Sequence, residues 1–446
     1  MILRFGSSKK IVTRSLAPNK PALVTVLDVG TTKICCAIAR LHPKARGLEL
    51  HGRTHAIEVI GFGHQRSRGI KAGSVIDLDS AEEAIRHAVD AAERQAGMTV
   101  ESIIVNVSDP NLRSKAFSAS VSLSGQEVED LDIHRVLAAG RDHCADEDGA
   151  VILHSQPIGY SLDRTDGIKD PRGMVGSRLG VDMHCVTAHD SALRNLELAI
   201  NRCHLSVENF VATPYSSGLS ALAGDETELG VACIDMGGGT TTVSIFVDGQ
   251  FVHSEGIAIG GRHVTNDLAR GLSTSLRDAE MIKVRHGSVL PGSCDDSAPV
   301  SVHQVADETG LSSDIAPSLI AKIIRPRVEE TLELIRDRLN ASGFASIALR
   351  RVVLTGGACQ LTGMSDLARS VLCKNIRLGR PLGVTGLPME ARGAAFATVV
   401  GLMIFPQITR IDETPSLTGM KSFRQPVKTA SGSYLGRVGT WIAGSF

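Results

Sequence analysis

The sequence predicts an α/β fold of two related lobes that close on one cleft, with an α+β module inserted in the first lobe. The duplication is predicted by two similar segments. Residues 26–33 read Val-Leu-Asp-Val-Gly-Thr-Thr-Lys, and residues 233–242 read Cys-Ile-Asp-Met-Gly-Gly-Gly-Thr-Thr-Thr. Each runs an apolar strand into an aspartate, glycines and hydroxyl residues, and a second apolar strand follows (34–39 and 243–247). This pattern is typical of a β-hairpin with a tight turn.

The two turns have the composition of a phosphate site. Glycine lets the backbone approach an anion closely, and successive turn N–H groups form a concave anion site. Threonine hydroxyls add donors, and an aspartate can hold a hydrated Mg²⁺. A tight corner is the simpler interpretation of either hairpin alone, but a corner has no need of a carboxylate. We therefore expect Asp28 and Asp235 to be metal ligands in a site that closes on a phosphate group from both sides.

Two further elements are suited to a nucleoside. Strand 352–354 delivers Thr355-Gly356-Gly357-Ala358 at its carboxyl end, where ligands bind in open α/β sheets. Glu280 and Lys283 are three residues apart and so share one helix face, from which they could hydrogen-bond a ribose and a base. An exposed helical ion pair is the alternative interpretation of Glu280 and Lys283.

Length and composition exclude several classes of protein. The 446 residues are enough for two or more domains. A formal net charge of −1 and an aromatic content of 3% argue against a nucleic-acid partner and a base-stacking platform. No segment reaches the roughly 18 apolar residues of a membrane span. Residues 1–20 contain several basic side chains and no acidic ones, which predicts a flexible arm, with a transit peptide as the alternative.

Periodicity predicts the order of the elements. Strands are expected over 23–62, followed by a helix from Ser80, its N-cap, to Ala96. Residues 102–185 alternate strands with one helix and predict the inserted module, with strands 102–107, 116–123 and 151–156 and helix 128–139. The second half predicts strands 231–247, 250–257 and 348–354, and helices 261–272, 275–286, 315–339, 364–372 and 391–403.

The last residues predict a contact with a membrane. Residues 433–446 place apolar side chains on one helical stripe, which is typical of an interfacial helix. A polar segment before the stripe predicts a flexible linker, whose Lys421, Arg424 and Lys428 would favour anionic lipid. Docking of the tail on its own domain is the alternative. The expected membrane-binding residues are Tyr434, Leu435, Arg437, Val438, Trp441, Ile442 and Phe446.

The order of two phosphate hairpins, a Glu-x-x-Lys helix and a Gly-Gly strand end resembles the actin, heat-shock chaperone and sugar kinase superfamily. Within it, the sequence from about residue 23 to residue 405 resembles most the FtsA family, the actin homologues of bacterial cell division. The runs that carry this resemblance are 67–71, 154–157, 167–174, 278–287 and 324–327. The α+β module stands where that family has it, in place of the usual second small subdomain.

The resemblance implies ATP with Mg²⁺ between the lobes. It implies phosphate contacts from Asp28, Gly30, Thr31, Thr32 and Lys33, and from Asp235, Gly237, Gly238, Gly239, Thr240 and Thr241 opposite them. It implies that Glu280, Lys283, Gly356, Gly357 and Ala358 surround the nucleoside. It also implies subdomains 1A (21–100 with 186–212), 1C (101–185), 2A (213–258 with 340–405) and 2B (259–339), a linker (406–432) and a membrane helix (433–446).

The function implied by the resemblance is a filament-forming scaffold. It would tether the tubulin-like division protein FtsZ to the cytoplasmic face of the inner membrane at midcell. Subdomain 2B would bind the FtsZ tail, and subdomain 1C would bind later division proteins. Thr213 stands where the chaperones have a glutamate that orients water, so we expect slow ATP hydrolysis at most. The alternatives are a pilus-assembly actin homologue and, less well supported, a small-molecule kinase.

Overall fold

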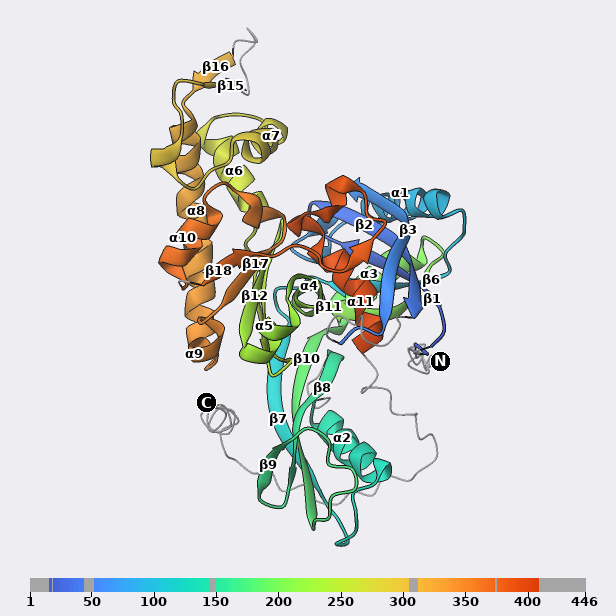
Figure 1. Ribbon diagram of the computed structural model, residues 1–446. Coiled ribbons are helices and arrows are strands. Elements are labelled where there is room, and N and C mark those ends of the chain that lie inside the picture. The colour runs from blue at the N-terminus through green and yellow to red at the C-terminus, as the bar shows by residue number, and fades with distance from the viewer. Residues whose placement is uncertain are drawn as a thin grey trace, which may run out of the picture.

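The computed structural model describes residues 16–17, 19–43, 52–144, 149–304, 312–373 and 375–408 (Figure 1). The predicted membrane helix, almost all of the predicted linker and most of the predicted basic arm lie outside the described residues. Within the described part of the chain, no helix is long and apolar enough to span a membrane.

Each lobe is built on one large sheet (Figure 1). The first sheet has the order β11-β6-β1-β2-β3-β19, with β1 Ala22–Val29, β2 Lys33–Pro43, β3 His55–Arg66, β6 Ser102–Val107, β11 Ser206–Ala212 and β19 Val384–Thr385. The second has the order β14-β13-β12-β17-β18, with β12 Val231–Met236, β13 Thr241–Val247, β14 Gln250–Ile257, β17 Val352–Thr355 and β18 Ile376–Leu378.

The two sheets share one topology. Strands β1, β2 and β3 form an antiparallel meander, and β6 and then β11 continue the sheet in parallel on the β1 side. Strands β12, β13 and β14 form the same meander, and β17 and then β18 continue it in parallel on the β12 side. The duplicated α/β fold is therefore confirmed, and each Gly-Thr hairpin supplies the first two strands, in chain order, of one of the two sheets.

Helices cover the sheets. In the first lobe and between the lobes they are α1 Leu78–Ala96, α3 Asp190–Asn201, α4 Thr213–Ala221, α5 Gly224–Leu229 and α11 Ala397–Ile408. In the second lobe they are α6 Gly261–Gly271, α7 Leu276–His286, α8 Pro317–Ala341, α9 Ala345–Ala348 and α10 Met364–Val371. The short strand pairs are β4 Ile70–Lys71 with β5 Ser74–Val75, and β15 Val300–His303 with β16 Ser312–Ile315.

Helices α4 and α11 form the layer between the two sheets. Val26 of β1 and Val353 of β17 both pack in the cluster that contains Val399 of α11, whereas Leu27 packs on the opposite face with α1 and α3. A strand covered on both faces is apolar along most of its length, and in β1 the polar side chains are those of Thr25 and Asp28.

The inserted module is a separate four-stranded sheet, drawn at the bottom of Figure 1. Its order is β7-β10-β8-β9, with β7 Arg113–Ser122, β8 Ala150–Leu162, β9 Thr165–Ile168 and β10 Arg178–His189. Helix α2 (Asp130–Cys144) packs on one face through Val136 and Leu137. The α+β insert is thus confirmed. Strand 102–107, grouped with the insert above, pairs in parallel with β1 and belongs to the first large sheet.

Several element boundaries differ from the sequence prediction, and three of them have a clear structural reason. Helix α1 begins two residues earlier, because Asp77 and not Ser80 is the N-cap and accepts from the backbone N–H of Asp79 and Ser80. Strand β17 begins only at Val352, because residues 345–348 form α9. Helix α11 begins at Ala397, because two 3₁₀ turns occupy residues 389–392 and 394–396.

The crossing of α4 and α11 predicts a sensitive glycine. A Cβ atom on Gly401 would lie 1.7 Å from the carbonyl oxygen of Ser216. Gly401→Ala should therefore lower the free energy of unfolding by about 1–3 kcal/mol, measured by urea denaturation, since the helices must separate. Gly292→Ala is the control, because a Cβ atom there meets nothing within 4 Å. Equal denaturation midpoints for the two variants would contradict the close packing.

Candidate functional site

The two Gly-Thr turns have the same backbone conformation. In the first, the N–H of Gly30 donates to the carbonyl of Lys33 at 3.0 Å. In the second, the N–H of Gly237 donates to the carbonyl of Thr240 at 2.9 Å. Each turn closes between the paired ends of its hairpin, β1 with β2 and β12 with β13.

The tips of the turns face and touch each other. A Cβ atom on Gly238 would lie 2.4 Å from the side chain of Thr32, and one on Gly239 would lie 2.3 Å from the Thr31 hydroxyl. Only glycine fits at these two positions without a shift of the opposite turn. The backbone of one lobe therefore lies directly against the hydroxyl side chains of the other.

Asp28 and Asp235 lie behind the two tips, and both are buried. Burial raises the pKa of Asp28 from its ordinary 3.8 to about 6; Lys33 opposes this rise and the negative charge of Asp235 adds to it. Burial also raises the pKa of Asp235, against hydrogen bonds from Ser217 and Thr398 and the charge of Lys33. The site thus holds two carboxylates that a cation between them would stabilise.

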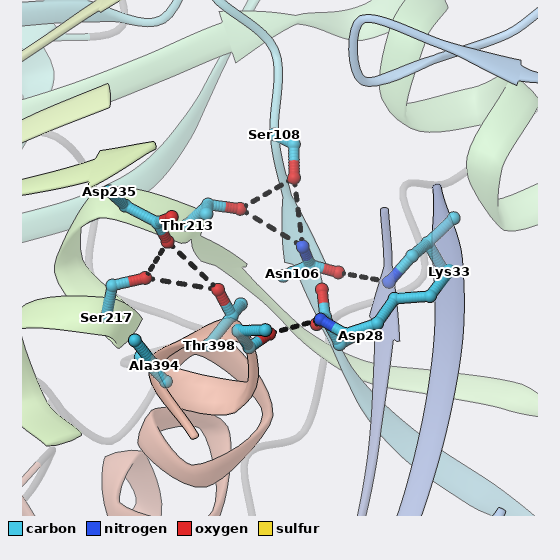
Figure 2. Close-up of polar contacts among 12 residues, drawn as sticks. Asp28, Lys33, Asn106, Ser108, Thr213, Ser217, Asp235, Ala394 and Thr398 are labelled. Carbon is cyan, nitrogen blue, oxygen red and sulfur yellow. Dashed lines mark hydrogen bonds and ion pairs between the residues drawn. The ribbon is translucent and has the colours of Figure 1, made fainter. Parts of the chain in front are cut away.

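Three hydroxyl or cationic groups hold these carboxylates (Figure 2). The Ser217 hydroxyl on α4 donates to Asp235, and the Thr398 hydroxyl on α11 donates to the same oxygen at 3.2 Å. The Lys33 ammonium lies 4.0 Å from an Asp28 oxygen and donates to the carbonyl of Ala395. Lys33 also lies 4.5 Å from the centre of the Phe396 ring. Its charge is therefore directed toward the segment before α11.

A second polar network, which sequence reasoning missed, lies beside Asp28 (Figure 2). Asn106 accepts from the N–H of Val29 at 2.6 Å and donates to Ser108 at 3.0 Å and to Thr213 at 3.1 Å. The hydroxyls of Ser108 and Thr213 lie 2.8 Å apart. The available signal was a polar Asn inside the apolar strand β6, near its carboxyl end. Thr213 contributes a hydroxyl to this network, and not a carboxylate.

The N-terminus of α6 is joined to the second turn. The N–H groups of Gly261 and Arg262 donate to the carbonyls of Gly237 and Gly238, at 2.9 and 2.7 Å. The Lys283 ammonium donates to the Gly261 carbonyl at 3.1 Å and to Glu280 at 2.7 Å. The predicted Glu280–Lys283 pair therefore shares one helix face and reaches the start of α6, which is itself joined to the second turn.

The Gly-Gly strand end packs against the same groups. Gly356 has φ +87°, and a Cβ atom there would lie 2.3 Å from an Asp235 oxygen. A Cβ atom on Gly261 would lie 3.2 Å from that of Ala358, which places Ala358 beside the start of α6. Gly357 follows Gly356 in the same turn.

Most of the predicted site residues are thus brought into one connected group. Thr240 is buried and supplies its carbonyl to the turn. Thr241 is fully buried in β13, and its hydroxyl donates to the carbonyl of Ile259 at 2.8 Å, so that group serves the fold. The rest of the group combines glycine backbone, hydroxyls and two carboxylates, a donor set that fits an anion with a hydrated divalent cation.

Family models match two parts of the chain. The model described as "Cell division protein FtsA" matches residues 232–401, and the model "SHS2 domain inserted in FTSA" matches residues 110–187. The second range contains β7, α2, β8, β9 and all but the last two residues of β10, the elements of the four-stranded sheet and its helix.

Solved structures share the fold at low sequence identity. The PilM-PilN type IV pilus biogenesis complex matches with a TM-score of 0.58 and 14% identity, covering 86% of this chain and 98% of that chain. MreB5 of Spiroplasma citri bound to ADP matches with a TM-score of 0.50 and 13% identity, covering 89% of this chain and 100% of that one. These likenesses show an actin-like fold.

Curated relatives match over the whole chain. The cell division protein FtsA of Rhizobium meliloti (strain 1021) is 52% identical over 445 residues, 99% of each chain. FtsA of Pseudomonas aeruginosa is 31% identical over 424 residues, covering 95% of this chain and 98% of that one. FtsA of Escherichia coli (strain K12) is 30% identical over 431 residues, with the same coverage. The chain belongs to the FtsA family of actin-like cell division proteins.

Proposed function

We propose that the chain binds ATP with Mg²⁺ between the two Gly-Thr turns, which move apart to admit the phosphates because they touch each other in this structure. The observation that carries this proposal is the contact of Gly238 and Gly239 with Thr32 and Thr31, which leaves only backbone and hydroxyl groups at the junction of the lobes. Two buried carboxylates behind the turns supply the oxygen ligands that Mg²⁺ prefers. The fold neighbour MreB5 is itself described as bound to ADP, which supports a nucleotide in a fold of this kind.

ATP would act mainly as a ligand that sets the shape of the subunit. Thr213, at the N-terminus of α4, offers a hydroxyl shared with Asn106 and Ser108. A hydroxyl does not ionise near neutral pH and is a poor general base. Slow hydrolysis at most is expected, and a purified chain that turned over about 10 ATP per second, a typical enzyme rate, would contradict this.

We further propose that the chain tethers FtsZ to the cytoplasmic face of the inner membrane at midcell and assembles into filaments. The family membership supports a role in division. Residues 259–339, which include α6, α7 and α8, would bind the FtsZ tail, and the inserted module would bind later division proteins. Residues 433–446, outside the described part of the chain, would attach the protein to anionic lipid.

Asp28→Asn tests the metal and nucleotide site. The variant keeps the size of the side chain but removes one of two carboxylate ligands, so the affinity for ATP with Mg²⁺ should fall at least 10-fold in isothermal titration calorimetry. Asp90→Asn is the control, because Asp90 is exposed on α1. If Asp28→Asn binds ATP with Mg²⁺ as tightly as the unmodified chain, Asp28 does not contribute to the binding site.

The same variant should stabilise the nucleotide-free protein. The pKa of Asp28 rises from 3.8 to about 6 on folding, so its ionisation reduces stability progressively between about pH 4 and pH 6, and the cost is complete at pH 7. Asparagine has no such cost. Asp28→Asn should raise the free energy of unfolding by about 1–3 kcal/mol at pH 7 and by little at pH 4. A gain that does not depend on pH would contradict the raised pKa.

Trp441→Glu tests the membrane attachment. A carboxylate at the centre of the apolar stripe should abolish co-sedimentation with vesicles that contain anionic lipid, because a charge would have to enter the apolar layer. Thr440→Glu is the matched control, since it adds the same charge one residue away and off the stripe. If Trp441→Glu still sediments with the vesicles, with or without FtsZ, the attachment does not depend on this segment.

A further inference from the structure

A large pocket lies along α4 and at the C-terminal end of α11, and the Gly-Thr turns do not belong to its wall. Its volume is about 830 Å³, within the ~300–1,000 Å³ range of pockets that bury a ligand. The inserted module, the second sheet and the layer of α4 and α11 all contribute to its wall. The apolar part of the wall includes Ile158, Tyr215, Leu222, Phe251, Ile404 and Ile408.

The described chain ends at this pocket. Ile408 is the last residue of α11 and lines the pocket wall, and the sequence continues from there to residue 446. Residues 409–432 can span up to ~80 Å at about 3.4 Å per residue, so length does not prevent residues 433–446 from returning to the pocket. A segment tethered this closely acts at an effective concentration of about millimolar.

The charge of the pocket wall is complementary to that segment. Carboxylates of Asp166, Asp182, Glu228 and Asp248 line the pocket. Burial raises the pKa of Asp248, the charge of Glu228 raises it further, and Lys169 opposes both. A further cation near these groups would therefore be stabilised.

The arginines of the wall already have partners. Arg53 donates to the carbonyls of Leu382 and Leu219, at 2.7 and 3.3 Å. Arg172 donates to Asp130 at 2.6 Å and to Asp170 at 2.9 Å. Within residues 433–446, the charged side chain is Arg437, on the flank of the apolar stripe. An apolar stripe with one cation thus matches an apolar pocket with an acidic rim.

We propose that residues 433–446 dock in this pocket of their own chain when no lipid is present, with Trp441 inserted among the apolar side chains and Arg437 at the acidic rim. The docked segment is withheld from the membrane, so lipid and pocket compete for one stripe. The docking is independent of the membrane attachment proposed above; only its effect on lipid binding depends on that proposal.

The single tryptophan of the chain makes the docking measurable without a label. In lipid-free protein, Trp441 should show the blue-shifted emission and weak acrylamide quenching of a buried indole. Leu382→Glu places a carboxylate in the pocket wall and should shift the emission to that of an exposed indole. Leu378→Glu is the matched control and should leave it unchanged, since Leu378 is 43% exposed, close to the 39% of Leu382, but does not line the pocket.

Several results would overturn the proposal. An exposed indole in the unmodified chain, or a buried indole that neither Leu382→Glu nor Ile408→Glu releases, would mean that the pocket does not hold this segment. Emission that changes on 100-fold dilution would identify a second copy as the occupant. Circular dichroism shows whether each variant is folded. If Leu382→Glu is not folded, Ile408→Glu tests the pocket at another residue of its wall.

Lipid titration tests the competition. Leu382→Glu should sediment with anionic vesicles at about 10-fold lower lipid concentration than the unmodified chain, whereas Leu378→Glu should not differ from it. If Trp441 is released in Leu382→Glu, but the unmodified chain, Leu382→Glu and Leu378→Glu all sediment at the same lipid concentration, then the pocket and lipid do not compete for residues 433–446. If no variant binds vesicles while Trp441 is docked, the membrane attachment fails and the docking stands.

Discussion

The contact between two glycine-rich turns is the constraint on which the rest of this structure depends. Gly238 and Gly239 lie so close to Thr32 and Thr31 that no side chain fits between the lobes. The carboxylates of Asp28 and Asp235 are buried directly behind, where burial and their mutual repulsion raise the pKa of Asp28. Such an arrangement is unfavourable by itself and becomes favourable when a cation and an anion occupy it together.

Two helices connect this site with the rest of the molecule. Ser217 of α4 and Thr398 of α11 both donate to Asp235, and other residues of the same helices, among them Leu219 and Ile408, line the pocket of about 830 Å³. Gly401 allows the two helices to touch without intervening side chains. A movement of one lobe against the other would therefore act on both the turns and the pocket, the two places where we propose that the nucleotide and residues 433–446 bind.

Much of the fold was predictable, because the repeated strand-Asp-Gly-Thr pattern is local and the two hairpins follow directly from it. The sequence also predicted the Glu280–Lys283 pair, which follows from helical spacing. Asn106, Ser108, Ser217 and Thr398 were not predicted, because their role depends on which strands and helices become neighbours. Thr241 also belongs to the motif, and in the structure its hydroxyl donates to the carbonyl of Ile259, a contact that the pattern does not predict. The pocket has no local signal, since its wall comes from segments that lie far apart in the sequence.

The proposed nucleotide site can be tested by a crystal structure of the full chain with Mg²⁺ and a non-hydrolysable ATP analogue. We expect the phosphates to lie between Thr31 and Thr32 on one side and Gly238 and Gly239 on the other, with Mg²⁺ nearest Asp28 and Asp235. A nucleotide bound elsewhere, for example in the pocket at the end of α11, or one that contacts only one of the two turns, would contradict this expectation.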